Sequence, residues 1–84
     1  MYRLEISRTA HRQISKLPEQ TQERIREAIA HLSEETHLHD SEKLTDGGGY
    51  RIRVGDHRII YQSDVETKTV TIYRVMSGWD VYRA

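Results

Sequence analysis

The first part of the chain combines a short extended pattern with a helical one. Residues 2–6 alternate between apolar and polar positions, which predicts a strand with Leu4 and Ile6 on one face. Apolar residues then recur at helical spacing from Arg8 to Leu17, on the face formed by Ala10, Ile14 and Leu17. Ser7 is a suitable N-cap for this helix. Pro18 ends it, because a residue before proline avoids the helical region.

A second helix is predicted to start at Pro18, since proline suits the first turn of a helix. Its apolar face follows the i, i+3, i+4, i+7 pattern through Ile25, Ala28, Ile29 and Leu32. We expect this helix to end near Glu34 or Glu35. The two helices would form a hairpin that covers one side of a sheet.

The second half of the chain has an extended pattern. A polar loop is predicted for residues 36–49, and strands are predicted for residues 50–54, 57–63 and 69–76, which are rich in β-branched and aromatic residues. Residues 77–84 form a tail. The order β-α-α-β-β-β predicts one α+β domain over residues 1–84, a small twisted antiparallel sheet with an N-terminal helical hairpin packed on one face.

A two-residue turn is predicted at Gly55-Asp56, where glycine comes first, as in a type II′ hairpin. This turn sets the register of the flanking strands. Val54 then lies opposite His57, Arg53 opposite Arg58, Ile52 opposite Ile59, and Arg51 opposite Ile60.

The two faces of this hairpin differ in character, because side chains alternate along a strand. One face is apolar and receives Tyr50, Ile52, Val54, His57, Ile59 and Tyr61. The other face receives three arginines, together with Ile60 and Gln62: Arg51, Arg53 and Arg58. Like charges directly opposite one another are destabilising, and a polyanionic ligand would relieve that repulsion. The alternative is a solvated face whose arginines pair with nearby acids such as Asp56, Asp64 and Glu66.

Composition narrows the setting. The chain has 84 residues and no cysteine, so neither a disulfide nor a thiolate metal site is expected. No apolar run resembles a signal peptide or a membrane span, which predicts a cytoplasmic protein. The formal net charge is zero, but residues 1–49 carry −2 and residues 50–84 carry +2. Neutrality argues against extended nucleic-acid binding and leaves a local cationic site as the expectation.

Residues 50–61, YRIRVGDHRIIY, resemble the central motif of the RelE/ParE toxin superfamily. The resemblance extends to Ala10, Leu17-Pro18 and Ile25 in the helices and to residues 80–83, DVYR, near the end of the chain. It implies the fold described above. It also implies a type II toxin–antitoxin toxin: RelE-like members cleave messenger RNA in the ribosomal decoding site, whereas ParE-like members inhibit DNA gyrase.

The resemblance assigns roles residue by residue. Arg51 and Arg53 match the basic positions that contact RNA, and Arg58 matches the arginine that stabilises the reacting phosphate. Tyr82 matches the tyrosine near the scissile nucleotide. We therefore expect catalytic roles for Arg51, Arg58 and Tyr82, and RNA binding by Arg53, Trp79 and Arg83.

The C-terminal region departs from the family pattern. Many members carry a basic or histidine-containing pair before the final tyrosine motif, but here residues 77–79 read Ser-Gly-Trp. Two roles are open for Trp79, stacking on an RNA base or packing in the core. Two are also open for Tyr82, proton transfer or packing of the tail. His57 is expected to be a partly buried strand residue, because the register points it away from the arginines.

The expected reaction needs no metal or cofactor, since the ribose 2′-hydroxyl attacks the adjacent phosphorus. The resemblance implies a cognate antitoxin as partner, with messenger RNA and the ribosome as targets and operator DNA bound only through the antitoxin. Two alternatives remain: a ParE-like gyrase inhibitor, and a catalytically weak module that only binds its antitoxin.

Overall fold

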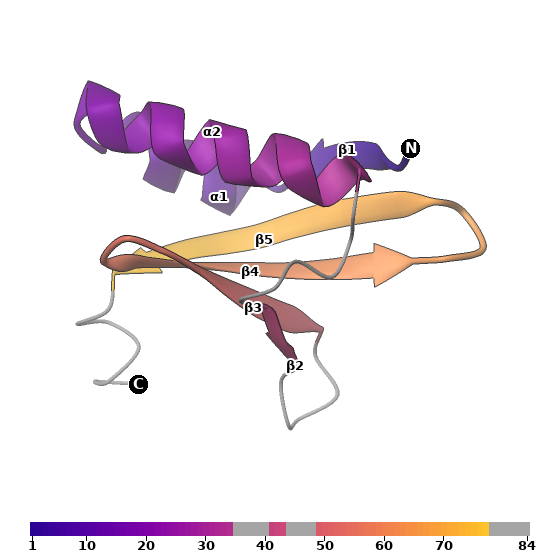
Figure 1. Cartoon of the computed structure of the whole chain (residues 1–84). Coiled ribbons are helices and arrows are strands. Elements are labelled where there is room, and N and C mark those ends of the chain that lie inside the picture. Colours follow the sequence, from indigo (N-terminus) through magenta and orange to yellow (C-terminus); the bar gives the residue numbers. More distant parts are fainter. Residues whose placement is uncertain (35–40, 44–48, 78–84) are drawn as a thin grey trace.

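The computed structural model describes residues 1–34, 41–43 and 49–77. In these residues a helical layer covers one face of a sheet, and the other face is open (Figure 1). The elements follow the order β1 (Arg3–Ile6), α1 (Arg8–Ser15), α2 (Glu19–Glu34), β2 (Ser41–Lys43), β3 (Tyr50–Val54), β4 (His57–Asp64) and β5 (Thr69–Ser77). The predicted α+β class is confirmed, and the predicted elements occur in the predicted order, with β2 in addition.

Within the described residues the strands form one sheet in the order β1-β5-β4-β3-β2. The pairings of β2 with β3, β3 with β4, and β4 with β5 are antiparallel, as predicted. The pairing of β1 with β5 is parallel, so the sheet is mixed rather than wholly antiparallel. The helical hairpin separates β1 from the other strands along the chain. Strand β1 is therefore not joined to β5 by a tight turn, and the two strands can run in the same direction.

The helices begin and end where local chemistry allows. The Ser7 side chain caps α1 by accepting a hydrogen bond from the Ala10 backbone N–H at 3.0 Å, as predicted. Helix α1 ends at Ser15, two residues earlier than expected, and α2 begins at Glu19, directly after Pro18. None of the helices in the described ranges is long and apolar enough to cross a bilayer.

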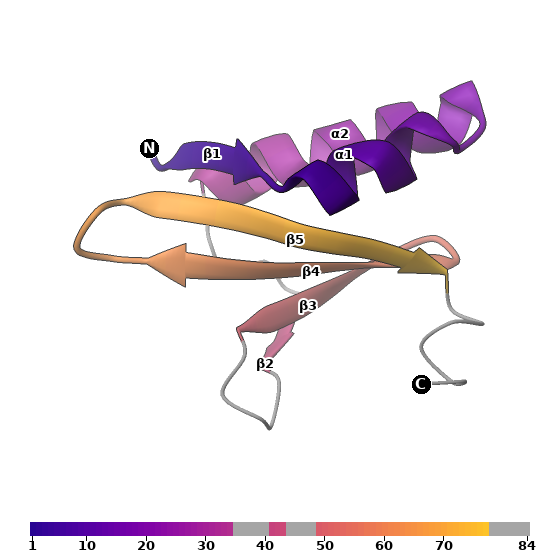
Figure 2. The same cartoon turned by 180° about the vertical axis from the view of Figure 1, so that it is seen from behind.

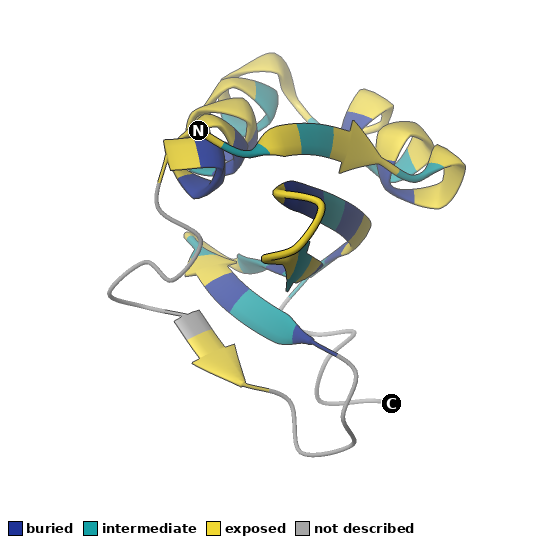
Figure 3. Ribbon diagram, turned by 90° about the vertical axis from the view of Figure 1, so that its right-hand side faces the viewer, coloured by how far each residue is buried: buried dark blue, intermediate teal, exposed yellow. Residues whose placement is uncertain are grey.

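The core lies between the helical layer and the sheet, where the buried residues of both layers meet (Figure 3). It consists of Ala10, Ile14, Ile25, Ile29, Leu32, Ile52, Ile59, Tyr61, Val70, Ile72 and Val75. Core residues alternate along β4 and along β5 as far as Ile72, so the intervening side chains there lie on the face away from the helices. Figure 2 shows from behind that both helices lie on the same side of the sheet.

A short strand, β2, lies within the segment that the sequence pattern predicts to be a loop. It pairs with β3, and its Glu42 is the register partner of Arg51. The sequence Ser-Glu-Lys carries none of the β-branched or aromatic residues typical of strands. An edge strand that contributes little to the core does not need them. Strand β2 therefore brings an acid next to Arg51.

Strand β5 extends beyond the end of its parallel neighbour β1. Side chains of Ser7 and Gln13 supply hydrogen bonds to the part of β5 that β1 does not reach. The Ser7 hydroxyl donates to the Tyr73 carbonyl at 2.7 Å. Further along, the Val75 backbone N–H donates to Gln13 Oε1 at 2.7 Å. These two bonds hold the second half of β5 against α1, where β5 no longer has β1 as a neighbour.

Candidate functional site

The candidate site is built on the β3–β4 hairpin, whose predicted register is confirmed. Arg53 lies opposite Arg58, and Arg51 lies opposite Ile60. At the turn, Gly55 has a φ of +60°, and Asp56 is not among the residues with positive φ. A type I′ turn would need positive φ at both positions, so the backbone agrees with the predicted type II′ turn.

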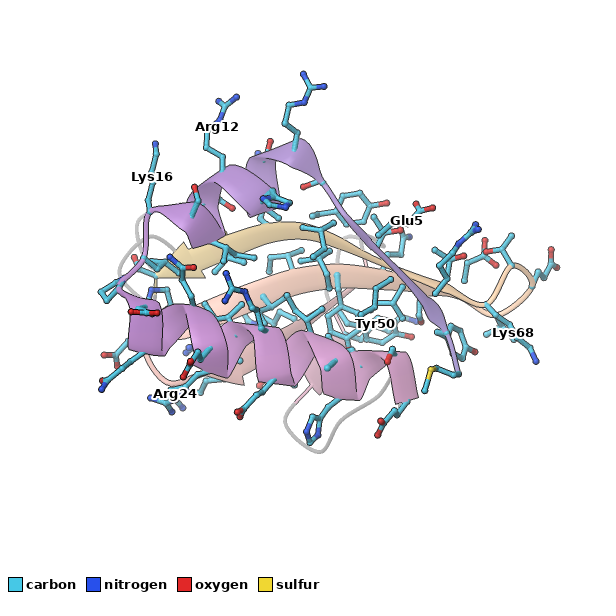
Figure 4. All side chains as sticks on the ribbon, turned by 90° about the horizontal axis from the view of Figure 1, so that it is seen from above. Glu5, Arg12, Lys16, Arg24, Tyr50 and Lys68 are labelled. Carbon is cyan, nitrogen blue, oxygen red and sulfur yellow. The ribbon has the colours of Figure 1, made fainter. Side chains whose placement is uncertain are left out.

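The turn is also held by packing. A Cβ added to Gly55 would lie 3.3 Å from Nη1 of Arg24, a residue of α2 that is labelled in Figure 4. The Arg24 guanidinium therefore lies directly against the turn. Glycine fits here for two reasons, because it adopts the positive φ and because it leaves room for this side chain.

The apolar face of the hairpin anchors it to the core. Ile52, Ile59 and Tyr61 are buried. The rings of Tyr50 and Tyr61 stack across β3 and β4, with centroids 5.6 Å apart and planes at 25°. His57 is half-buried on this same face, as predicted, and so points away from the arginines. These contacts fix both strands. The side chains that alternate with the buried residues must therefore point to the opposite, outer face.

The outer face of the hairpin carries the three predicted arginines, as the confirmed register requires. Arg58 is central among them: it lies directly opposite Arg53, and diagonally across from Arg51, which faces Ile60. Diagonal neighbours on one face are about 7–8 Å apart at Cα, within reach of long side chains. We call these residues, with Arg74 of β5, the arginine face.

One of the arginines is neutralised within the chain. Arg51 donates from Nε and Nη2 to Oε2 of Glu42, at 3.1 and 2.9 Å. Both side chains remain partly exposed, at 37% and 65%. An ion pair of this kind contributes about 0–1 kcal/mol to stability, so a phosphate can replace the carboxylate at little cost.

The other two predicted arginines have no acidic partner among the described residues. Arg58 is half-buried and donates from Nη1 to the carbonyl of His57 at 3.3 Å, a bond that fixes its side chain without neutralising it. Arg53 is exposed. The acids that the alternative interpretation offered, Asp56, Asp64 and Glu66, form no ion pair with them. Within the described part of the chain, the alternative of a face whose arginines pair with nearby acids therefore holds for Arg51 alone, and with Glu42 rather than with these three residues.

The arginine face has a fourth member that the sequence pattern does not reveal. Arg74 of β5 is the register partner of Ile60 and so lies on the same face as Arg51 and Arg58. Simple alternation from Val70 and Ile72 would place Arg74 among the core residues. A register shift between Ile60 and Tyr61 inserts Tyr73, and this bulge turns Arg74 outward. Without a signal for the bulge, the sequence alone hides it.

The far end of the same face has the opposite charge. A shallow hollow near the β4–β5 turn is lined by Arg3 and by three carboxylates, those of Glu5, Asp64 and Glu66. Arg3 is also within ion-pair distance of Glu5, at 3.8 Å. The face is therefore polarised, with arginines toward the β3–β4 turn and carboxylates toward the β4–β5 turn.

The predicted site residues of the tail cannot be placed. Trp79, Tyr82 and Arg83 lie outside the described residues, so their proposed roles stay predictions.

The fold and this hairpin site define a class of small proteins, the toxins of type II toxin–antitoxin systems. The family profile that matches is described as the ParE toxin of the type II toxin–antitoxin system parDE, and it covers residues 4–82. The chain belongs to the RelE/ParE superfamily of these toxins. A comparison with curated protein sequences found no match.

Solved structures agree with this assignment. The chain is similar to one from the toxin–antitoxin complex RelBE2 of Mycobacterium tuberculosis, with 32% identity and a TM-score of 0.80 over 90% of this chain and 96% of that one. A chain from the archaeal RelE–RelB complex of Pyrococcus horikoshii has 25% identity and a TM-score of 0.77, over 90% and 93%. The E. coli RelBE complex, at 19% identity, a TM-score of 0.80 and coverage of 92% and 96%, shows the shared fold.

Proposed function

We propose that this toxin is a metal-independent endoribonuclease that cleaves messenger RNA on translating ribosomes in the cytoplasm. The observation that carries the proposal is the arginine face, where Arg58 is surrounded by other arginines and has no acidic partner among the described residues. Guanidinium groups match phosphate oxygens in charge and geometry. The sequence resemblance to RelE-like nucleases at Arg51, Arg53 and Arg58 supports the same conclusion.

In the proposed reaction the ribose 2′-oxygen forms a bond to the adjacent phosphorus, and the bond from phosphorus to the 5′-oxygen breaks. The 2′-hydroxyl loses its proton, and the leaving 5′-oxygen takes up a proton. The products are a 2′,3′-cyclic phosphate and a 5′-hydroxyl. Charge that develops on the phosphoryl oxygens is stabilised by cations already in place, and losing one such group costs about 10²–10³-fold in rate.

The roles of individual residues follow from their surroundings. Arg58 is half-buried in the middle of the arginine face and is assigned to the phosphoryl oxygens, with Arg51 beside it after release from Glu42. Exposed Arg53 holds the RNA backbone. Arginine stays protonated and is a poor base, so the proton transfers are assigned to Tyr82, which the family resemblance matches to a tyrosine near the scissile nucleotide. Trp79 and Arg83 complete the assignment as RNA contacts.

The proposed partner in the cell is a cognate antitoxin. The M. tuberculosis and E. coli relatives are described as toxin–antitoxin complexes, which supports this proposal. An exposed cationic face is complementary to an acidic segment that orders on binding. Contact with operator DNA is then made only through the antitoxin, as the family resemblance implies.

A second candidate function is inhibition of DNA gyrase. The matching family profile is that of ParE toxins, and residues 77–79 lack the basic pair of many RelE-like nucleases. The neutral overall charge would also suit a weak module that only binds its antitoxin. In both cases the arginine face would be a protein-binding surface rather than a catalytic one.

Induced expression in growing cells distinguishes these functions. A nuclease arrests translation within minutes, and new 5′-hydroxyl ends appear inside coding regions of messenger RNA. Filamentation with DNA-damage signalling and intact messenger RNA would contradict the nuclease and support gyrase inhibition. Unchanged growth would contradict both and leave the antitoxin-binding module.

A further inference from the structure

Arg74 projects onto the arginine face because of one irregularity in β5. Ile72 faces Tyr61 and Val75 faces Ile59, and all four of these residues are buried. Two residues, Tyr73 and Arg74, lie between these inward-facing pairs, where regular alternation would leave room for one. Both are exposed, and the Tyr73 hydroxyl is 3.0 Å from Oε1 of Gln62, to which it donates on the outer face. The bulge therefore directs Arg74 outward.

The neighbours of Arg74 are cationic or apolar. It faces Ile60 across β4, and Ile60 in turn faces Arg51 of β3, so the three residues form one row across three strands. Arg58 faces Met76, two positions further along β5, and is thus a diagonal neighbour of Arg74. Among the described residues Arg74 forms no ion pair, although three carboxylates line the hollow at the other end of the face.

This arrangement is unfavourable for folding alone. A bulge disrupts the strand ladder locally, and here it adds a fourth like charge to the arginine face, where the described residues supply one paired carboxylate, that of Glu42. Turned inward, Arg74 would disturb the core. Turned outward, it gains no partner in the described part of the chain. A polyanion that crosses the sheet would satisfy it.

We propose that Arg74 is a further RNA-contacting residue, which binds a backbone phosphate next to the one held at Arg58. Arg74 and Arg51 are two strands apart, about 10 Å at Cα, so they reach different phosphates. The RNA backbone then crosses β3, β4 and β5 in the direction of this row, and the carboxylates at the far end exclude it from the rest of the sheet. Arg74 is a positioning residue, and its role rests on the proposed RNA-cleaving function.

Binding of a fully 2′-O-methylated single-stranded RNA, which cannot be cleaved by 2′-hydroxyl attack, tests this inference. The dissociation constant is measured from 50 to 200 mM salt. Removing one phosphate contact with Arg74→Ala should weaken binding and reduce the slope of log affinity against log salt by about 0.7. Arg74→Lys should restore the slope, because it keeps the charge. The matched control is Arg12→Ala, whose side chain projects from α1 away from the rest of the molecule (Figure 4).

The outcomes separate the two hypotheses. An unchanged slope for Arg74→Ala, with wild-type binding intact, overturns the role of Arg74 and leaves the proposed function standing. The same result follows if Arg12→Ala changes the slope equally. A wild-type chain that does not bind the RNA also overturns the inference, and the induced-expression experiment then decides the proposed function separately. Thermal unfolding of each variant shows that the fold is retained.

Discussion

Arg51 differs from the other arginines because its charge is already compensated. Its guanidinium holds Glu42 Oε2 at 2.9 Å, and both side chains are partly exposed. A phosphate that binds Arg51 has to displace this carboxylate. Glu42 therefore competes with RNA for the same donor, and it also lowers the repulsion within the arginine face when no ligand is bound.

Replacing Glu42 by glutamine should raise RNA affinity about two- to fivefold, since an exposed ion pair contributes at most about 1 kcal/mol. The uncleavable RNA used for Arg74 serves as the probe. Glu23, an exposed residue of α2, provides the control. Glu23→Gln removes the same charge away from the site and should leave RNA affinity unchanged. Weaker binding by Glu42→Gln would mean that Glu42 orients Arg51 for the ligand rather than competing with it.

On the edge that does not face β4, the second half of β5 is hydrogen-bonded by side chains of α1 and its N-cap. Beyond Ile72, where β1 ends, the Val75 N–H is satisfied by the side chain of Gln13 at 2.7 Å. Arg74 lies directly before Val75. Helix α1 thus fixes, from the opposite layer, the part of the sheet that directs Arg74 outward.

Gln13→Ala should destabilise the fold by about 1–3 kcal/mol, because it leaves a part-buried backbone donor unsatisfied. Urea unfolding measures this loss. Gln13→Glu is the matched control, since it keeps an acceptor oxygen at the same place, and it should remain close to wild type. A loss below about 0.5 kcal/mol for Gln13→Ala would show that water or a backbone shift replaces the bond.

Across the whole molecule, much of the fold follows from the spacing of apolar residues. The helices, β3, β4 and β5 are all visible in the sequence, and the Gly55-Asp56 turn fixes which side chains of the hairpin share a face. That is why the placement of Arg51, Arg53 and Arg58 could be predicted. Their positions depend on local rules, namely a tight turn and two-residue alternation.

The features that the sequence hides are those set by tertiary contacts. Strand β2 has three polar residues, and only its pairing with β3 makes it a strand, so the acid beside Arg51 could not be foreseen. Arg74 is hidden by a single inserted residue that reverses the alternation of β5. A parallel partner for β5 likewise depends on the path of the helical hairpin rather than on the residues of β1.

Charge distribution on the molecule as a whole explains how a neutral chain can bind RNA. Zero formal net charge hides a separation, with arginines at one end of the open face and carboxylates at the other. A short stretch of backbone at the arginine end is all that the proposed reaction needs. The proposed reaction therefore depends on Arg58, which lies among the arginines at that end of the face.

The most direct test is end mapping of messenger RNA from cells that express wild type or Arg58→Ala. Wild type should produce 5′-hydroxyl ends within codons, and Arg58→Ala should reduce their rate of appearance about 10²–10³-fold. Both purified chains should show the same circular dichroism spectrum and similar thermal unfolding, which shows that the variant is folded. Cleavage at the wild-type rate by Arg58→Ala, or no new ends from wild type, would contradict the account.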